Sequence, residues 1–125
     1  GKRVLLVDVY DLNMEIAEYD LVADGAVVMK AWNGKEAVTA FEKSAPGSIS
    51  LVLMDLMMPV MDGLEATRAI RALDRADAAS VPIIAMTANA FDEDRERTKA
   101  AGMNAHLSKP LDMRALIDAV KRYGR

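Results

Sequence analysis

Cysteine is absent from this 125-residue chain and histidine occurs once, and each shortage excludes a class of site. Without cysteine there is no disulfide bond, no thiolate nucleophile and no cysteine-bound zinc, and a single histidine excludes a paired-histidine metal site. No Gly-rich loop follows any apolar segment, which excludes a nucleotide-binding P-loop and a dinucleotide fingerprint. Any metal ion must therefore be bound through oxygen atoms.

Long hydrophobic runs and a basic surface are also missing. The longest apolar runs, at 50–54 and 81–86, fall far short of the roughly 20 residues that span a bilayer, and no signal-peptide pattern opens the chain. The net charge of -3, without a Lys and Arg cluster, argues against direct nucleic-acid binding. We expect one soluble, cytoplasmic domain over residues 1–125, with no membrane contact by this segment. Because the chain begins with Gly1 instead of Met, we expect a piece of a longer protein or a processed tag.

Five apolar segments alternate with segments of helical period. The segments at 3–8, 26–31, 49–55, 81–87 and 105–109 are nearly continuous in hydrophobicity, which is typical of strands buried on both faces of a parallel sheet. Capping residues are expected at the helix starts, namely Asn33, Asp62, Asp92 and Asp112. Alternating strands and helices predict an α/β fold with right-handed crossovers and an open, doubly wound sheet.

Four residues with reactive side chains stand at the predicted strand ends: Asp8, Asp55, Thr87 and Lys109. Open parallel sheets bind ligands outside the carboxyl ends of their strands. Carboxylates suit Mg²⁺, while a hydroxyl and an ammonium complement the oxygens of a phosphoryl group in transfer. One aspartate can also act as the nucleophile and form an aspartyl phosphate. The pattern predicts a phosphoryl-transfer site at this edge of the sheet.

Four motifs, in this order, resemble the receiver domain of two-component response regulators: VLLVD at 4–8, LVLMDLMMPVMDGLEATRAIR at 51–71, IIAMTANAF at 83–91 and GMNAHLSKPLD at 102–112. The resemblance covers the whole chain and is greatest for receivers attached to hybrid sensor histidine kinases. It implies a flavodoxin-like (βα)5 fold whose five-stranded parallel sheet has the order 2-1-3-4-5. It also implies a signalling domain that takes a phosphoryl group from a partner phosphohistidine without turning over a substrate, and so is not an enzyme in that sense.

The resemblance implies a role for each strand-end residue. Asp55 matches the phosphoacceptor, Thr87 the hydroxyl that reaches the phosphoryl group and changes orientation, and Lys109 the ammonium that pairs with the acceptor. Asp8, Asp55 and the backbone carbonyl of Met57 match the ligands of Mg²⁺. The implied partner is a histidine kinase or a histidine phosphotransfer domain. A kinase core or effector domain of the same protein would lie outside this segment, in a hybrid kinase that is membrane-tethered or free.

Two further positions match the family in place but leave their roles open. Pro110 corresponds to the cis proline that aims the lysine. His106 stands where the family has an aromatic switch residue, on the face of the fourth helix, fifth strand and fifth helix that carries the output. Histidine either keeps that rotamer switch or, since it can charge near neutral pH, senses pH.

Val9 is the main departure from the family pattern, which has two adjacent acids where this chain has Asp8 and Val9. An isopropyl group cannot coordinate a hard cation, so we expect a loss of roughly 1 to 3 kcal/mol, about tenfold to a hundredfold, in Mg²⁺ affinity. Asp11 either reaches back to the metal or, as we prefer, is an N-cap or first-turn acid of the first helix. Asp20 replaces an expected apolar residue and marks a local distortion or a partner contact.

Two other function classes compete with the phosphorylated receiver. A pseudo-receiver would be an interaction module whose output ignores phosphorylation, and Val9 supports it. A phosphatase of the haloacid dehalogenase type would use Asp8 as its nucleophile, but it needs a second Asp two residues later, where this chain has Tyr10. Labelling of Asp8, in place of Asp55, would favour that class.

Overall fold

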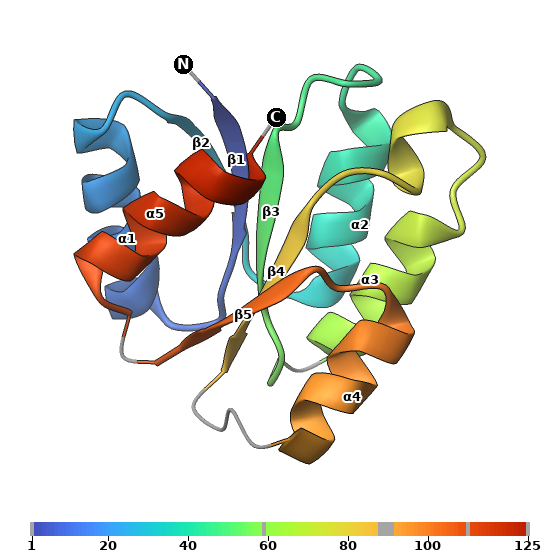
Figure 1. Ribbon diagram of the computed structural model, residues 1–125. Helices are drawn as coiled ribbons and strands as arrows, with labels where there is room; N and C mark the ends of the chain where they lie inside the picture. The colour runs from blue at the N-terminus through green and yellow to red at the C-terminus, as the bar shows by residue number, and fades with distance from the viewer. Residues whose placement is uncertain (1, 59, 88–91, 110, 125) are drawn as a thin grey trace.

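The computed structural model describes residues 2–58, 60–87, 92–109 and 111–124. Five parallel strands form one sheet, with helices on both of its faces (Figure 1). The strands are β1 (Arg3–Val7), β2 (Val27–Ala31), β3 (Leu51–Asp55), β4 (Ile83–Thr87) and β5 (Ala105–Ser108). They pair in the order β2-β1-β3-β4-β5, and each pair is parallel. The predicted order 2-1-3-4-5 is confirmed.

The helices are α1 (Asp11–Ala23), α2 (Gly34–Lys43), α3 (Gly63–Arg71), α4 (Asp92–Ala101) and α5 (Met113–Tyr123), with a short 3-10 helix at Ala76–Ala78. Buried side chains of α1 and α5 pack on one face of the sheet, and those of α2, α3 and α4 pack on the other. Strand residues alternate between the two cores: Leu5 and Val7 enter one, Val4 and Leu6 the other. The doubly wound arrangement follows from this alternation.

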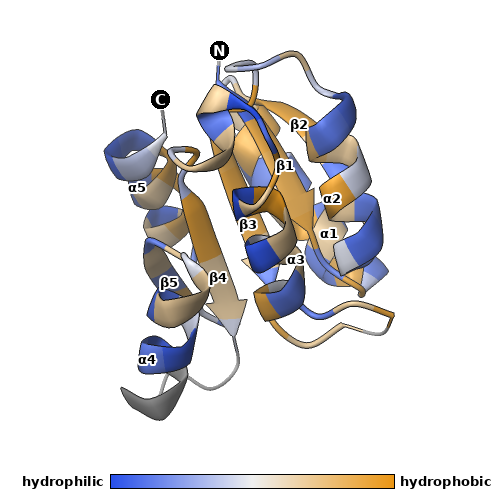
Figure 2. Ribbon diagram, turned by 90° about the vertical axis from the view of Figure 1, so that its right-hand side faces the viewer, coloured by the Kyte–Doolittle hydropathy of each residue, from blue (hydrophilic) through white to orange (hydrophobic). Residues whose placement is uncertain are grey.

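The three central strands are the ones that the apolar runs describe best. Every residue of β3 and β4 is buried, and so are the last four residues of β1. Figure 2 shows the hydrophobic residues that run along β4. By contrast, β2 and β5 are edge strands with partly exposed side chains. Burial on both faces was thus predicted correctly for the centre of the sheet and wrongly for its edges. None of the helices in the described part of the chain has the length and apolar character that crossing a membrane requires.

Side-chain caps begin three of the helices as predicted. The side chains of Asn33, Asp62 and Asp112 accept hydrogen bonds from backbone N–H groups in the first turns of α2, α3 and α5. Such a cap contributes about 1 kcal/mol because it satisfies a donor that the helix itself leaves unpaired. The fourth cap prediction, Asp92, stays a prediction, because α4 is described from Asp92 onward and the residues before it lie outside the described part of the chain.

An ion pair holds the loop between α3 and β4 against the end of α2. The Arg75 guanidinium lies 2.6 Å from the Asp77 carboxylate and donates hydrogen bonds to the backbone carbonyls of Phe41 and Ser44. Its central carbon also lies over the Phe41 ring, 4.6 Å from the centre of that ring. Asp77 also accepts the Gly47 N–H at 2.8 Å. The hydrogen bonds from Arg75 and Gly47 outweigh burial and lower the pKa of Asp77 to about 2.

We expect the Asp77 pair to contribute to acid resistance. A carboxyl group with a lowered folded-state pKa stabilises the fold above its ordinary pKa, near 4, and this stability is lost as pH falls toward about 2. Asp77→Asn should lower the free energy of unfolding by roughly 1 kcal/mol at pH 6, which is less than the full linkage value because of solvent screening, and by progressively less as the pH falls through about 2. Urea unfolding across this pH range measures the difference. Asp74→Asn changes an exposed neighbour and is the matched control; an equal pH dependence in both variants would contradict the assignment.

Candidate functional site

Two carboxylates and one ammonium meet at the carboxyl ends of the central strands. Asp55 is the last residue of β3, and Asp8 directly follows the adjacent strand β1. Lys109, which follows β5, places Nζ 3.0 Å from Asp8 Oδ2 and 3.2 Å from Asp55 Oδ2. Both carboxylates are almost fully buried, at 2% and 3% exposure. The topology therefore brings together three of the four predicted strand-end side chains in one cluster of direct contacts.

Backbone donors occupy the other oxygen of each carboxylate. The Tyr10 N–H donates to Asp8 Oδ1 at 3.1 Å, and the Met57 N–H donates to Asp55 Oδ1 at 3.4 Å. Each acid thus has one oxygen on the backbone and one on Lys109. This arrangement orients the two carboxylates side by side and balances part of their charge.

The loop after Asp55 is held by two close backbone approaches. A Cβ atom on Gly63 would collide with the Asp55 carbonyl oxygen, and one on Gly34 would collide with the Met61 carbonyl oxygen. The N–H groups of the same glycines donate to Leu56 and Met61 carbonyls at 3.1 and 3.0 Å. Only glycine allows this packing. The starts of α2 and α3 therefore fix the loop that follows Asp55.

Burial is the main electrostatic influence on Asp55. It raises the pKa of this carboxyl above its ordinary value, and repulsion from Asp8 acts in the same direction, while attraction to Lys109 opposes both. Asp55 consequently takes up a proton at a higher pH than an exposed aspartate. A more basic carboxylate is also a better nucleophile once it is ionised.

Thr87 lies next to this cluster at the end of β4. It is 5% exposed, follows Met86, the register partner of Asp55, and accepts the Lys109 N–H at its carbonyl at 2.8 Å. The fourth predicted strand-end residue thus lies at the same edge of the sheet. Pro110, predicted as the cis proline, lies outside the described residues.

Two of the predicted metal ligands, Asp8 and Asp55, lie side by side at the strand ends. Asp8 and Asp55 supply two buried carboxylates, and Mg²⁺ in proteins takes one or two carboxylates together with phosphate oxygens and water. The described residues contain no group of three or more acids or histidines suited to a metal. Val9 is half-buried, and Asp11 is exposed at the first position of α1. Asp11 is a first-turn acid, as we preferred, and the donor set fits Mg²⁺ with two carboxylates.

His106 is tied to α4 by a partner that sequence reasoning missed. Its Nε2 lies 2.6 Å from the Thr98 hydroxyl, and that hydroxyl donates to the Arg95 carbonyl at 3.0 Å. This contact joins β5 to α4 whichever of the two groups supplies the proton. Thr98 is 1% exposed. The one indication of this contact in the sequence is that Thr98 lies one turn before the end of the polar helix α4.

The outer face of α1 is a second feature that sequence reasoning missed. Leu12, Ile16 and Tyr19 are 67%, 50% and 76% exposed, although Met14 and Ala17 on the opposite side of the same helix are buried. The 4-3 spacing of the three exposed residues is typical of a helix that packs against another helix. Apolar stripes on both sides of α1 are the signal that was available.

Asp20 belongs to the junction of α1 with the Lys109 segment. It lines a small cavity of about 30 Å³ together with Asn13, Ile16 and Lys109. Since α1 runs unbroken from Asp11 to Ala23, the expected local distortion is wrong. The second interpretation, a partner contact, stays a prediction.

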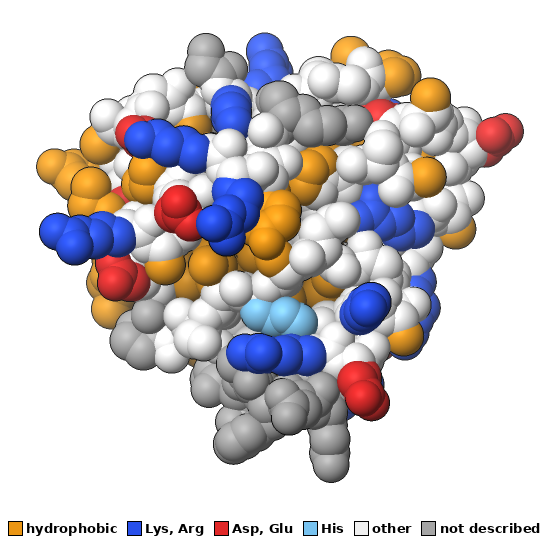
Figure 3. Space-filling model, viewed as in Figure 1, with side chains coloured by type: hydrophobic (Ala, Val, Ile, Leu, Met, Phe, Trp, Pro, Cys, Tyr) orange, Lys and Arg blue, Asp and Glu red, His pale blue; other side chains and the backbone are white. Residues whose placement is uncertain are grey.

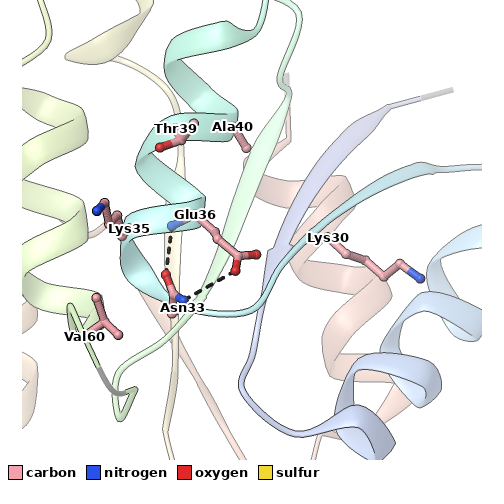
Figure 4. Close-up of a pocket in the computed structure, with 7 residues that line it drawn as sticks. All are labelled: Lys30, Asn33, Lys35, Glu36, Thr39, Ala40 and Val60. Carbon is pink, nitrogen blue, oxygen red and sulfur yellow. Dashed lines mark hydrogen bonds between the residues drawn. The ribbon is translucent and has the colours of Figure 1, made fainter.

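A larger hollow, of about 540 Å³, lies away from the carboxylates at the start of α2 (Figure 4). The Glu36 N–H donates to Asn33 Oδ1 at 2.9 Å, and the Glu36 carboxylate accepts from the Trp32 N–H and the Asn33 amide. Val60, on the opposite rim, has a φ of 70°, which a β-branched residue rarely adopts. The polar groups here form a helix cap, and the hollow is separate from the strand-end site.

Comparisons with known proteins agree with this geometry. The family model described as the response regulator receiver domain matches residues 4–121. The receiver domain of a sensor histidine kinase from Pseudomonas aeruginosa PAO1, solved with a magnesium ion coordinated in its active site cleft, is 38% identical, covers 98% of this chain and 97% of its own, and has a TM-score of 0.88. The polar-differentiation response regulator DivK of Brucella anthropi is 33% identical over 98% of this chain and 95% of that protein.

Several relatives are much longer than this chain. The probable histidine kinase 4 of Oryza sativa subsp. japonica is 34% identical over 98% of the chain, which spans 14% of that kinase. The chain is 35% identical to the probable histidine kinase 2 of Oryza sativa subsp. indica over 96% of its own length, and it spans 12% of that kinase. The likeness to these kinases is thus a likeness to one part of each.

Proposed function

The chain belongs to the family of response regulator receiver domains, and from this membership we propose that it takes a phosphoryl group from a partner phosphohistidine onto Asp55. Receiver domains are signalling domains of two-component systems and are typically phosphoacceptors. The observation that carries the proposal is the contact of Lys109 Nζ with both Asp8 and Asp55 at the strand ends. We assign the whole chain, residues 1–125, to one receiver domain that modifies itself and turns over no substrate.

The transfer we propose begins with attack of an Asp55 carboxylate oxygen on phosphorus. The P–N bond to the partner imidazole breaks, its electron pair stays on the ring nitrogen, and an acyl phosphate forms. Lys109 supports the reaction because its ammonium, already 3.2 Å from Asp55, neutralises the charge that gathers on the phosphoryl oxygens. The Thr87 hydroxyl is the proposed second donor to those oxygens.

Asp8, Asp55 and the backbone carbonyl of Met57 are the proposed ligands of Mg²⁺, which supplies additional charge neutralisation when bound. The missing acid at Val9 leaves two carboxylates where the family has three, so we propose a weakened metal affinity. The same feature supports the second candidate function, a pseudo-receiver that acts as an interaction module without phosphorylation. The phosphatase interpretation loses support, because the second acid it needs is Tyr10, which is 64% exposed.

The Val9→Asp variant tests the metal part of the proposal. We expect acetyl phosphate to add one phosphoryl group to both proteins, with the variant needing about tenfold to a hundredfold less Mg²⁺ for half-maximal modification. Intact-protein mass measured across a Mg²⁺ titration gives both curves. Val22→Asp, the same change at an exposed α1 position away from the carboxylates, should leave the curve unchanged. No phosphoryl mass at any Mg²⁺ concentration would favour the pseudo-receiver.

We further propose that modification is passed from Thr87 to His106 and changes the face formed by α4, β5 and α5. His106 pairs in register with Ala85, two residues before Thr87 on the neighbouring strand. The hydrogen bond between His106 and Thr98 gives this route a contact with α4. Whether His106 changes rotamer or charge stays a prediction.

The exposed apolar face of α1 is the proposed docking surface for the phosphoryl donor. Receiver domains partner with histidine kinases or phosphotransfer proteins, whose helices suit the 4-3 spacing of Leu12, Ile16 and Tyr19. A kinase core or effector in the same protein is a further proposed partner. We propose a cytoplasmic location, consistent with two-component signalling, either in a free protein or in the cytoplasmic part of a membrane-tethered kinase.

A further inference from the structure

All the sulfur in this chain belongs to methionine, since the sequence has nine methionines and no cysteine. Three of the methionines, Met29, Met58 and Met61, are partly buried against the hydrophobic core. Met57 and Met113 are exposed, at 81% and 54%. The other four are buried, at 6% exposure or less, namely Met14, Met54, Met86 and Met103. Met57 is therefore the methionine most open to an oxidant in solution.

The apolar side chains exposed on α1 offer no competing sulfur. They lie over the left edge of the molecule in Figure 3 and are Leu12, Ile16, Tyr19 and Val22. Peroxides oxidise the thioether of methionine to a sulfoxide, and the rate follows the exposure of the sulfur. We therefore expect a peroxide to react first at Met57.

Met57 is also tethered beside the proposed phosphoacceptor. Its N–H donates to Asp55 Oδ1 at 3.4 Å, so standard bond lengths keep its sulfur within about 9 Å of that carboxylate. The backbone is held there because the Gly63 N–H donates to the carbonyl of Leu56, the residue between Asp55 and Met57, at 3.1 Å. The sulfur consequently stays near Asp55 in every rotamer of the side chain.

We propose that Met57 is a reversible oxidation site, at which peroxide slows phosphoryl acceptance by Asp55. A lone pair of the Met57 sulfur attacks one oxygen of hydrogen peroxide and the O–O bond breaks. The departing hydroxide takes the proton from the oxygen now bonded to sulfur and leaves as water. The sulfur loses two electrons, the peroxide gains them, and methionine sulfoxide is formed. The effect on acceptance rests on the proposed function, whereas the oxidation site does not.

The sulfoxide acts on the strand-end site through its charge distribution. Its oxygen carries a partial negative charge, and the phosphoryl group that approaches Asp55 is also negative. At the distance given above, we expect acceptance to slow by about two- to fivefold. The fold should stay intact, because a side chain that is 81% exposed buries little apolar surface. Oxidation of a core methionine such as Met54 would instead disrupt the packing.

Treatment of the whole chain with hydrogen peroxide, followed by peptide mapping with tandem mass spectrometry, tests the oxidation site. We expect Met57 to gain one oxygen before Met113 and before its neighbours Met58 and Met61, while circular dichroism stays unchanged. The rate at which acetyl phosphate adds a phosphoryl group is then measured before and after oxidation. Met57→Leu removes the sulfur and keeps an apolar side chain, and Met113→Leu is the matched control at the other exposed methionine.

Peroxide should slow acceptance by the unmutated protein and by Met113→Leu, and Met57→Leu should keep its own untreated rate. The two methionine sulfoxide reductases, one for each epimer, should restore the rate. Oxidation at Met113 ahead of Met57, an unchanged rate in the Met57-oxidised protein, or equal slowing of Met57→Leu would overturn the proposal. If no sample gains a phosphoryl group, the proposed function and the effect on acceptance are both rejected, and the peptide map alone decides the oxidation site.

Discussion

Replacing Asp55 by Asn is expected to abolish phosphoryl acceptance from acetyl phosphate, with no added mass at any Mg²⁺ concentration. The physical reason is that an amide oxygen is a poor nucleophile and cannot carry the charge that forms the acyl phosphate. Mass measurement of the intact protein records the loss. Peptide mapping of the unmutated protein should place the phosphoryl group on the peptide that contains Asp55.

The Asp8→Asn variant is the matched control, because it removes the other buried carboxylate that contacts Lys109. It should still accept the phosphoryl group, at a higher Mg²⁺ concentration. Asp55→Asn should also lose no stability near neutral pH, since burial and Asp8 raise the pKa of Asp55 and so disfavour its charged form. A label that persists in Asp55→Asn and disappears in Asp8→Asn would instead support the phosphatase class.

Replacing Arg71 by Met is expected to produce the largest loss of stability among single changes of charged residues, about 4 kcal/mol. The guanidinium donates to the carbonyl of Gly102 at 3.1 and 2.7 Å and to those of Ala78 and Val81 at 3.1 and 2.6 Å, and it also reaches the Asn104 side chain at 3.0 Å. These acceptors belong to the loops before β4 and β5. Methionine keeps the packing of the stem but leaves the half-buried carbonyls without their charged donor.

Urea unfolding followed by circular dichroism measures this effect, with the free energy extrapolated to water. Arg68→Met, in the same helix but exposed, is the control and should change stability by less than about 0.5 kcal/mol. If the two variants were equally stable, Arg71 would not hold the two loops together. Because Gly102 follows α4, Arg71→Met should also increase hydrogen exchange of the amides at the end of that helix.

Much of the fold follows from local sequence patterns. The caps at Asn33, Asp62 and Asp112 were predictable because each depends on residues within one turn of the chain. Strand positions were predictable because central strands need continuous apolar runs. Local patterns are weakest at the margins of the sheet, where the edge strands β2 and β5 are less buried than their apolar runs indicated.

The sequence by itself determined the α/β class, the places of Asp8, Asp55 and Lys109 at strand ends, and the absence of the acid at Val9, since all of these depend on order along the chain. Only the tertiary structure decided that one ammonium contacts both carboxylates and that burial raises the pKa of Asp55. It also decided that Thr98 holds His106. These properties depend on distances between residues on different strands and helices, which become defined only when the sheet and its helices have packed.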